Sequence, residues 1–596
     1  MFNNLLKCLA GSAAGLVAAA LLTGGAVHAQ PSFFEEATAA YGVNASGNCG
    51  DVVWYDWDND GDLDLLLAVR FGSESFIFQN DGGHFTRLHD IGLPMDDDGG
   101  RPIPMDFDHD GDLDLFFLHY PNYSAMYVNE GGHFMDRTFD LGLPNDYHDR
   151  DYKWIDFNHD GWMDLLLGNE ESGFSLWRND NGTHFTDVTA QSHLPVLTSF
   201  MQIAEADYDL DGEVDIFNTS LTGEDHLFHN DGNGVFTDVT QSAGLGSAVG
   251  TGGCVWVDID HNKYPDLLTE GPQRHAIWHN NGDGTFTEMN VHGMETDFAG
   301  GDYPNTAYYG VADFDMDGDA DIYVCRPGGC GSGLAANQFF IQDSLRYPDI
   351  WFHDVAPQWG LDYAEDGAPG IADFDGDGAL DLYITRQDNS YVLLHNTINS
   401  RNSLQVRALG PNGELDRWHT RVDVYAHGSN AVMASSELNT SNVARSGMNN
   451  YFVLDENGHY DLRIYFANGV TMLPGDYPQL SDVVPSQINH LLTVYEGRPL
   501  AVQEVNRQAL DFRLAEVYPN PFNSRTTIRY TMPAAGYARL GVYDVLGRRV
   551  KDLVNETVSA GNHSVQWNAS SAASGVYFLR LEANNQVARQ RALLLK

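Results

Sequence analysis

Residues 56–64 read DWDNDGDLD, a loop of nine residues with an aspartate at its first, third, fifth, seventh and ninth positions and a glycine at its sixth. Six further stretches follow this pattern closely, and they start at residues 106, 156, 207, 258, 313 and 373. We number the seven stretches loops 1 to 7. Their starts lie 50 to 60 residues apart, and a regular period of this length indicates a repeat architecture.

Each loop presents oxygen atoms at alternate positions. In loop 1 the side chains at positions one, three, five and nine can each donate an oxygen, position seven can donate its carbonyl, and Gly61 permits the tight turn. Oxygen ligands at this spacing favour calcium, and a divalent cation would offset the repulsion among four carboxylates. A plain Asp-rich turn is the alternative reading of one copy, but seven copies in register favour a metal site.

The sequence therefore predicts up to seven structural Ca²⁺ ions. The expected ligand positions are Asp56, Asp58, Asp60, Asp62 and Asp64; Asp106, Asp108, Asp110, Asp112 and Asp114; Asp156, Asn158, Asp160, Trp162 and Asp164; Asp207, Asp209, Asp211, Glu213 and Asp215; Asp258, Asp260, Asn262, Tyr264 and Asp266; Asp313, Asp315, Asp317, Asp319 and Asp321; Asp373, Asp375, Asp377, Ala379 and Asp381. Loop 5 should bind most weakly, because Lys263 replaces the turn glycine and must adopt a left-handed conformation.

The segments between the loops carry four strand signals per repeat. One apolar run enters a loop, as in residues 52–55, a second leaves it, as in 65–69, a third ends in a turn such as Asn-Asp-Gly at 80–82, and a short fourth run follows, as in 185–189. Four strands per fifty residues predict an all-β, seven-bladed β-propeller with calcium loops. The last repeat lacks a fourth strand, and residues 33–38 match it, so we expect the N-terminal segment to complete a propeller over residues 31–396.

The composition changes after the repeats. Residues 402–496 hold short strand patterns that predict a small β domain, and we expect residues 497–512 to be a linker and residues 513–596 to form a C-terminal β-sandwich of Ig-like type. The segment 501–596 carries a net charge of +5, whereas the rest of the chain carries −57. This acidity argues against a nucleic-acid partner, because phosphates require a basic surface.

The N-terminal segment has the pattern of a secretory signal peptide. Lys7 precedes an apolar stretch over residues 8–27, and the small-residue pattern Val-His-Ala at 27–29 marks a cleavage site, so residues 1–29 are expected to be removed. A membrane anchor is the alternative reading of the same stretch. We expect no transmembrane segment in the mature chain, because no other segment is apolar enough.

An exported protein meets oxidising conditions, in which disulfides form. Cys325 and Cys330 flank the sequence Arg-Pro-Gly-Gly, and we expect a short-range disulfide between them. The pairing of Cys49 and Cys254 stays open.

Three segments resemble known families. The acidic loops, the Asn-Asp-Gly turns and strands such as FTDVT at 236–240 resemble the FG-GAP, or VCBS, repeats of integrin-like propellers. Residues 402–496 resemble the ASPIC/UnbV domain of relatives of cartilage acidic protein, through 451–454 and 462–469. The motifs YPNPFN at 518–523, VYDVLGR at 542–548 and GVYFLR at 575–580 are similar to the type A sorting domain of type IX secretion. This last resemblance implies that the type IX secretion machinery carries the protein to the cell surface or beyond it.

The sequence contains no recognisable catalytic motif: Gly-x-Ser-x-Gly, His-Glu-x-x-His, P-loop and Cys-x-x-Cys patterns are all absent. Propeller ligands usually bind over the channel on the face opposite such loops. Of the residues expected there, His148, Asp149 and Arg150 form the cluster with the most ionisable side chains, so we expect a ligand site at this cluster. We expect an adhesion or ligand-binding module for an extracellular glycan or protein. A carbohydrate-active enzyme and a surface scaffold remain alternatives.

Overall fold

The structure is a computed structural model of the full chain. It describes residues 33–58, 62–70, 75–89, 91–93, 99–119, 124–143, 149–195, 197, 200–220, 225–232, 234–246, 252–270, 275–294, 307–325, 337–359, 361, 368–386, 390–398, 402–410, 417–438, 449–466, 479–488, 490–496, 513–518, 522, 525–532, 536–543, 548–558, 561–569, 572–583 and 586–595. Within these ranges, no helix is long and apolar enough to cross a membrane. The expected signal peptide, residues 1–29, lies outside them.

The described part of residues 34–396, which we call the repeat region, contains seven antiparallel sheets with four strands each, and the sixth has an additional parallel strand. In chain order the strands are β2 (Asn48–Tyr55), β3 (Asp64–Arg70), β4 (Phe76–Asn80) and β5 (Phe85–Arg87); β6 (Gly99–Met105), β7 (Asp114–His119), β8 (Ala125–Asn129) and β9 (Phe134–Asp136); β10 (Asp149–Ile155), β11 (Asp164–Asn169), β12 (Gly173–Asn179) and β13 (Phe185–Asp187); β14 (Phe200–Ala206), β15 (Asp215–Ser220), β16 (His226–Asn230) and β17 (Phe236–Asp238); β18 (Cys254–Val257), β19 (Asp266–Glu270), β20 (His275–Asn280) and β21 (Phe286–Glu288); β23 (Tyr308–Ala312), β24 (Asp321–Cys325), β25 (Gln338–Arg346) and β26 (Asp349–Asp354), with β22 (Asn290–His292); β27 (Gly370–Ala372), β28 (Asp381–Thr385), β29 (Tyr391–Asn396) and β1 (Phe34–Glu36). Three short helices, α2 (Thr38–Tyr41), α3 (Thr189–Ser192) and α4 (Ala356–Trp359), follow outer strands.

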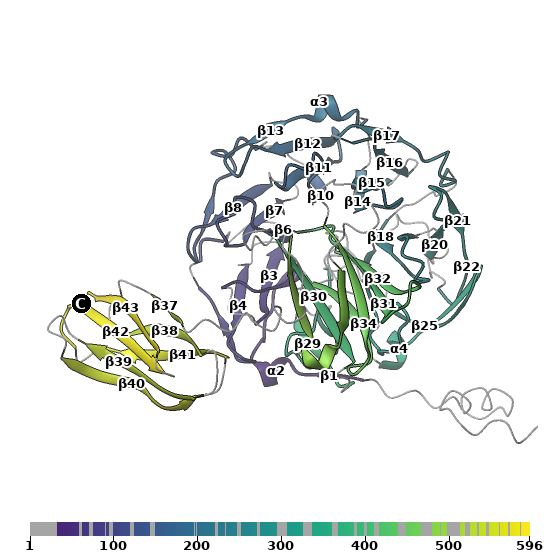
Figure 1. Cartoon of the computed structure of the whole chain (residues 1–596). Coiled ribbons are helices and arrows are strands. Elements are labelled where there is room, and N and C mark those ends of the chain that lie inside the picture. Colours follow the sequence, from purple (N-terminus) through teal and green to yellow (C-terminus); the bar gives the residue numbers. More distant parts are fainter. Residues whose placement is uncertain are drawn as a thin grey trace, which may run out of the picture.

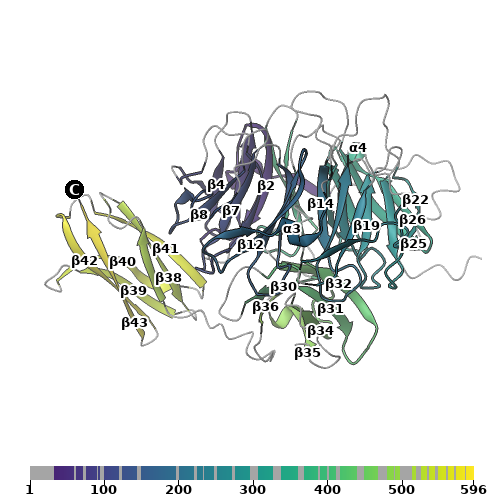
Figure 2. The same ribbon diagram turned by 90° about the horizontal axis from the view of Figure 1, so that it is seen from above.

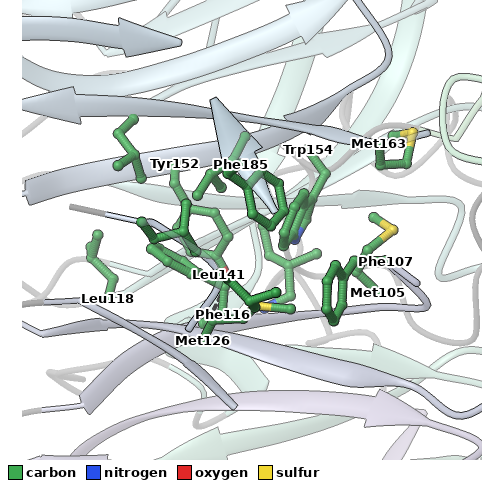
Figure 3. Packing of buried hydrophobic residues seen from close by; sticks show 14 of the residues in the cluster. Met105, Phe107, Phe116, Leu118, Met126, Leu141, Tyr152, Trp154, Met163 and Phe185 are labelled. Atoms are coloured by element: carbon green, nitrogen blue, oxygen red, sulfur yellow. Dashed lines mark hydrogen bonds between the residues drawn. The ribbon is translucent and has the colours of Figure 1, made fainter. Parts of the chain in front are cut away.

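The sheets lie around a circle, with the first strand of each sheet nearest the centre (Figure 1). Inner strands such as β11, β14 and β15 are buried on both faces, because each sheet is covered by its neighbours. Between the second and third sheets, for example, Met105 and Phe116 pack against Tyr152 and Trp154 (Figure 3). Burying one such large side chain contributes roughly 1.5–3 kcal/mol, so contacts between neighbouring sheets are a main source of stability.

The first and last sheets of the repeat region meet. The N-terminal strand β1 pairs with β29, with Phe34 opposite Asn396, as the sequence predicts. Trp54 of the first sheet stacks on Phe374 of loop 7, which follows β27 of the last sheet, with the ring centroids 5.6 Å apart. The N-terminal segment thus supplies the fourth strand that the last repeat lacks.

Two further pairs of sheets follow. The middle sheet pair consists of β30 (Ser403–Leu409), β31 (Arg421–Ala426), β32 (Val432–Glu437), β33 (Asn449–Val453), β34 (Tyr460–Tyr465), β35 (Gln479–Val483) and β36 (Leu491–Tyr495), with the 3-10 helix η1 (Pro485–Gln487). The C-terminal sheet pair consists of β37 (Arg513–Tyr518), β38 (Arg525–Met532), β39 (Gly536–Tyr543), β40 (Arg549–Val558), β41 (Gly561–Asn568), β42 (Gly575–Ala583) and β43 (Gln586–Leu594). Each pair has its own apolar core. The middle sheet pair lies against one face of the repeat region (Figure 2).

Only one cysteine of the expected disulfide between Cys325 and Cys330 is described, and it is the last residue of β24. Cys325 is buried there, and Cys330 lies outside the described residues. The disulfide therefore stays a prediction.

Candidate metal centres in the acidic loops

Each acidic loop connects the first strand of a sheet to the second, and its ninth residue begins the second strand. That aspartate is buried and holds the backbone on both sides. In loop 3, Asp164 accepts hydrogen bonds from the backbone N–H of Asn179 at 2.7 Å and of Phe157 at 3.3 Å. The equivalent bond from the third strand recurs at Asp64, Asp114, Asp215, Asp266, Asp321 and Asp381. The ninth residue therefore links the start of the second strand to the third strand and to the loop segment that follows the first strand.

The first and sixth positions close the turn. The backbone N–H of Gly161 donates to Asp156 at 2.9 Å, and that of Lys263 donates to Asp258 at 2.8 Å. Lys263 has a φ of 77°, so it adopts the predicted left-handed conformation. Its ammonium lies 4.9 Å from the ring centroid of Tyr264. Loop 5 thus keeps the turn despite its lysine, at the conformational cost that a side chain brings to this region.

In six of the seven repeats, an asparagine near the end of the third strand connects the loop to its surroundings, whereas loop 6 has Gln342 at this position. The side-chain amide of Asn179 donates to the carbonyl of Met163 in its own loop at 3.1 Å, and to that of Phe107 in the preceding loop at 3.0 Å. Asn280 of the fifth sheet and Asn396 of the seventh make the same two contacts, one with their own loop and one with the preceding loop. From the sequence this asparagine signals only a turn. Its regular place after the third apolar run, in six of the seven repeats, is the sequence signal that indicates a second role.

The fourth position of the loops also has left-handed backbone, with a φ of 59° at His109, 56° at His159 and 58° at His261. These side chains reach the next loop. His159 Nε2 lies 2.7 Å from a carboxylate oxygen of Glu213, and the ring of His109 stacks on Trp162 with centroids 3.9 Å apart. Neighbouring loops are therefore in direct contact.

Burial and mutual repulsion disfavour full ionisation of the loop carboxylates. Burial raises the pKa of Asp114 to about 9, and neighbouring aspartates add to the effect. The pKa values of Asp313 and Asp373 rise to about 7, again chiefly through burial. Buried oxygens of Asp114, Asp315 and Asp373 have no hydrogen-bond partner. These carboxylates fit a divalent cation, which would supply the missing positive charge.

Three loops also receive a histidine from the third strand. The groups are Asp209, Asp215 and His229; Asp260, Asp266 and His279; and Asp375, Asp377 and His395, and within each group the potential ligand atoms lie within 4.8 Å of one another. His229 Nδ1 is 3.0 Å from an oxygen of Asp215, and this contact raises the pKa of the imidazole to about 9. These histidines were not among the predicted ligands, although each immediately precedes the asparagine of its strand.

The other acidic triads follow the same plan. Asp56, Asp58 and Asp64 form one group and Asp106, Asp108 and Asp114 another, each with oxygens within 4.8 Å. The seventh-position residue donates its backbone N–H to the fifth-position side chain, as Trp162 does to Asp160 at 3.0 Å. Asp60 is the one predicted ligand position outside the described residues.

The cluster expected on the opposite face is engaged within the protein. Asp149 begins β10, is buried, and accepts hydrogen bonds from Ser124 Oγ at 2.9 Å and from the amide of Asn169 at 3.1 Å. Arg150 pairs with Glu170 at 2.9 Å. His148 lies outside the described residues, so a ligand site here stays a prediction.

Two family models match the chain. A model described as "FG-GAP-like repeat" matches residues 56–117, 156–218 and 207–269, and one described as "Secretion system C-terminal sorting domain" matches residues 516–595. The FG-GAP and sorting-domain resemblances are thereby confirmed.

Curated relatives include cartilage acidic protein 1 from Mus musculus and from Homo sapiens. Each is 26% identical over 213 residues, which is 34% of this chain and 31% or 30% of the relative. The match therefore spans about a third of the length of these relatives, and it agrees with the ASPIC/UnbV resemblance.

Similar solved structures include two distant matches. An Agrocybe aegerita lectin that recognises non-reducing terminal N-acetylglucosamine is 17% identical, over 58% of this chain and 87% of that chain, with a TM-score of 0.37. PorZ, a surface component of the type IX secretion system of Porphyromonas gingivalis, is 13% identical, over 91% and 81%, with a TM-score of 0.19.

Proposed function

We propose that this chain, which carries FG-GAP-like repeats and a secretion system C-terminal sorting domain, is a calcium-binding adhesion or ligand-binding module on the cell surface. The sorting domain indicates export by type IX secretion to the cell surface or the extracellular space. The observation that carries the calcium proposal is the repeated grouping of buried loop carboxylates, several with oxygens that no protein group satisfies.

In this proposal the repeat region is a seven-bladed β-propeller over residues 31–396. Support comes from the arrangement of its sheets around a circle and from the pairing of β1 with β29. Residues 402–496 are an ASPIC/UnbV-like domain, residues 497–512 a linker, and residues 513–596 an Ig-like sandwich that engages the type IX secretion machinery.

Calcium has a structural role in this proposal. The side chains at positions one, three, five and nine and the carbonyl at position seven hold the ion, which supplies positive charge where acids converge. The protein's own contribution is to fix those groups: the ninth aspartate anchors the third strand, and the sixth residue anchors the first aspartate. With the loops held rigid, the propeller keeps a fixed shape for binding its ligand.

The ligand class is an extracellular glycan or protein, because export places the module outside the cell. The test is a glycan and peptide array probed with the mature protein, residues 30–596, in calcium and after its removal. We expect specific, calcium-dependent binding to one class of spots. Equal binding to all spots, or none, would contradict the ligand-binding role.

A further inference from the structure

The middle sheet pair lies against one face of the repeat region (Figure 2) and contacts acidic loops there. The amide of Gln405 donates to Asp373, the first residue of loop 7, at 3.1 Å. The hydroxyl of Tyr451 donates to the carbonyl of Gly378 in the same loop. Two contacts thus join β30 and β33 to one predicted metal site.

A second area of contact lies near loops 2 and 3. Trp418 and Leu438, which are 7% and 3% exposed, pack in one cluster with Phe107, Trp154 and Met163 of the repeat region. His419 Nε2 lies 3.3 Å from the carbonyl of Trp154. Burial of Trp418 and Leu438 stabilises the docked arrangement through the hydrophobic effect.

Between these areas, Glu437 at the end of β32 reaches loop 4. One of its carboxylate oxygens accepts a hydrogen bond from the backbone N–H of Asp207, the first residue of that loop, at 3.4 Å. The side chain is only 6% exposed, and its other carboxylate oxygen is buried with no hydrogen-bond partner. A buried, half-satisfied carboxylate is costly unless a cation lies nearby.

Two cationic side chains lie near Glu437, but neither satisfies its second carboxylate oxygen. Arg421 pairs with Glu437 in the β31–β32 register, but its Nε lies 3.2 Å from Asp423 and its guanidinium stacks on Tyr465, 4.1 Å from the ring centroid. His419 Nδ1 is 3.4 Å from the oxygen of Glu437 that already faces Asp207. The second oxygen of Glu437 remains unsatisfied.

The surroundings of Glu437 hold charges of both signs, with acids in excess. Glu437 lines a cavity of about 160 Å³ between the middle sheet pair and the loops, together with Asp258, Asp313 and Asp373, the first residues of loops 5, 6 and 7, and with Lys263 and Arg421. Glu437 also faces loop 4, through its hydrogen bond with the backbone N–H of Asp207. Docking therefore brings a further negative charge to a loop that is already acidic.

We propose that Glu437 is an additional ligand of the cation in loop 4, so that this ion ties the middle sheet pair to the repeat region. The inference rests on the proposed calcium binding by the loops. Because Glu437 comes from outside the repeats, the ion binds the docked arrangement more tightly than the undocked one. By linkage, the ion then favours docking to the same degree.

The test compares Glu437→Gln with Glu456→Gln, a matched change at the turn before β34. Calcium titration calorimetry of the mature protein should show one site weakened by about tenfold or lost in Glu437→Gln, and no change in the control. If the unaltered protein binds no calcium, the proposed function fails. If it binds calcium and Glu437→Gln binds equally well, this inference alone is overturned.

Asp209→Asn in loop 4 provides a second route, in case Glu437→Gln disturbs the fold. It leaves Glu437 in place but weakens the ion site. Hydrogen exchange in calcium should increase at least severalfold in the segment around Trp418, while the C-terminal sheet pair stays unchanged. Unaltered exchange around Trp418 in a variant that has lost one ion would overturn the inference.

Discussion

At the residue scale, Lys263 occupies the sixth loop position, which is glycine in the other six loops. Its φ of 77° costs a residue with a side chain roughly 1–2 kcal/mol. We therefore expect Lys263→Gly to raise the free energy of unfolding by about 1 kcal/mol and to strengthen calcium binding at loop 5. Urea denaturation and calcium titration measure the two effects. Lys263→Asn should give part of the gain, and a less stable glycine variant would contradict the strain argument.

The buried asparagine of the third strand gives a second prediction at this scale. Asn179 donates to two loop carbonyls and accepts from the N–H of Gly182. Asn179→Ala leaves these groups unsatisfied, so we expect a loss of about 2–3 kcal/mol in urea denaturation. Asn44→Ala, at an exposed position, is the control and should change stability by less than about 0.5 kcal/mol. Equal effects of the two changes would refute the bridging role.

At the scale of the elements, the loops predict a characteristic response to pH. In metal-free protein the pKa values of Asp313 and Asp373 are about 7 when folded, against about 3.9 in an unfolded chain. The folded state then binds more protons between these values, so their contribution to stability is lost as the pH rises from about 4 to 7. In calcium the trend should reverse, because protons compete with the ion.

Thermal unfolding of metal-free and calcium-loaded protein across this pH range measures the effect. The stabilisation by calcium should grow with pH. Parallel curves, with and without calcium, would contradict the role of these carboxylates as ligands.

The strand β1 allows a test of the contact between the two ends of the repeat region. Phe34 is 8% exposed and packs with Phe314, Phe339 and Trp359. We expect Phe34→Ala to cost roughly 3–5 kcal/mol in urea denaturation, because it leaves a cavity in this cluster. Glu35→Ala, on the exposed side of the same strand, is the control. Similar stability of both variants would mean that β1 contributes little to the fold.

At the scale of the whole molecule, local sequence patterns predicted the positions of the repeats and of most of their strands. The period of the acidic loops located the repeats, and the strand signal at residues 33–38 located the partner of β29. In the middle region, the short strand patterns predicted over residues 402–496 correspond to strands β30 to β36. The three-residue parallel strand β22 was not predicted.

Contacts between distant segments could not be derived in the same way. The approach of His229 to loop 4 and the bridge from Asn179 to loop 2 depend on how neighbouring strands and sheets align. The position of Glu437 against Asp207 joins residues 230 apart, and no period in the sequence encodes it. Sequence patterns gave the loops as single ligand sets, whereas the structure links them to one another and to the middle sheet pair.

The central claim is that the acidic loops bind calcium and thereby stabilise the repeat region. Isothermal titration of metal-free mature protein with calcium, at neutral pH and with magnesium in excess, tests it most directly. The account predicts several ions per chain, up to seven and with one distinctly weak, together with a large rise in the unfolding temperature. No measurable calcium binding, with an unchanged unfolding temperature, would contradict it.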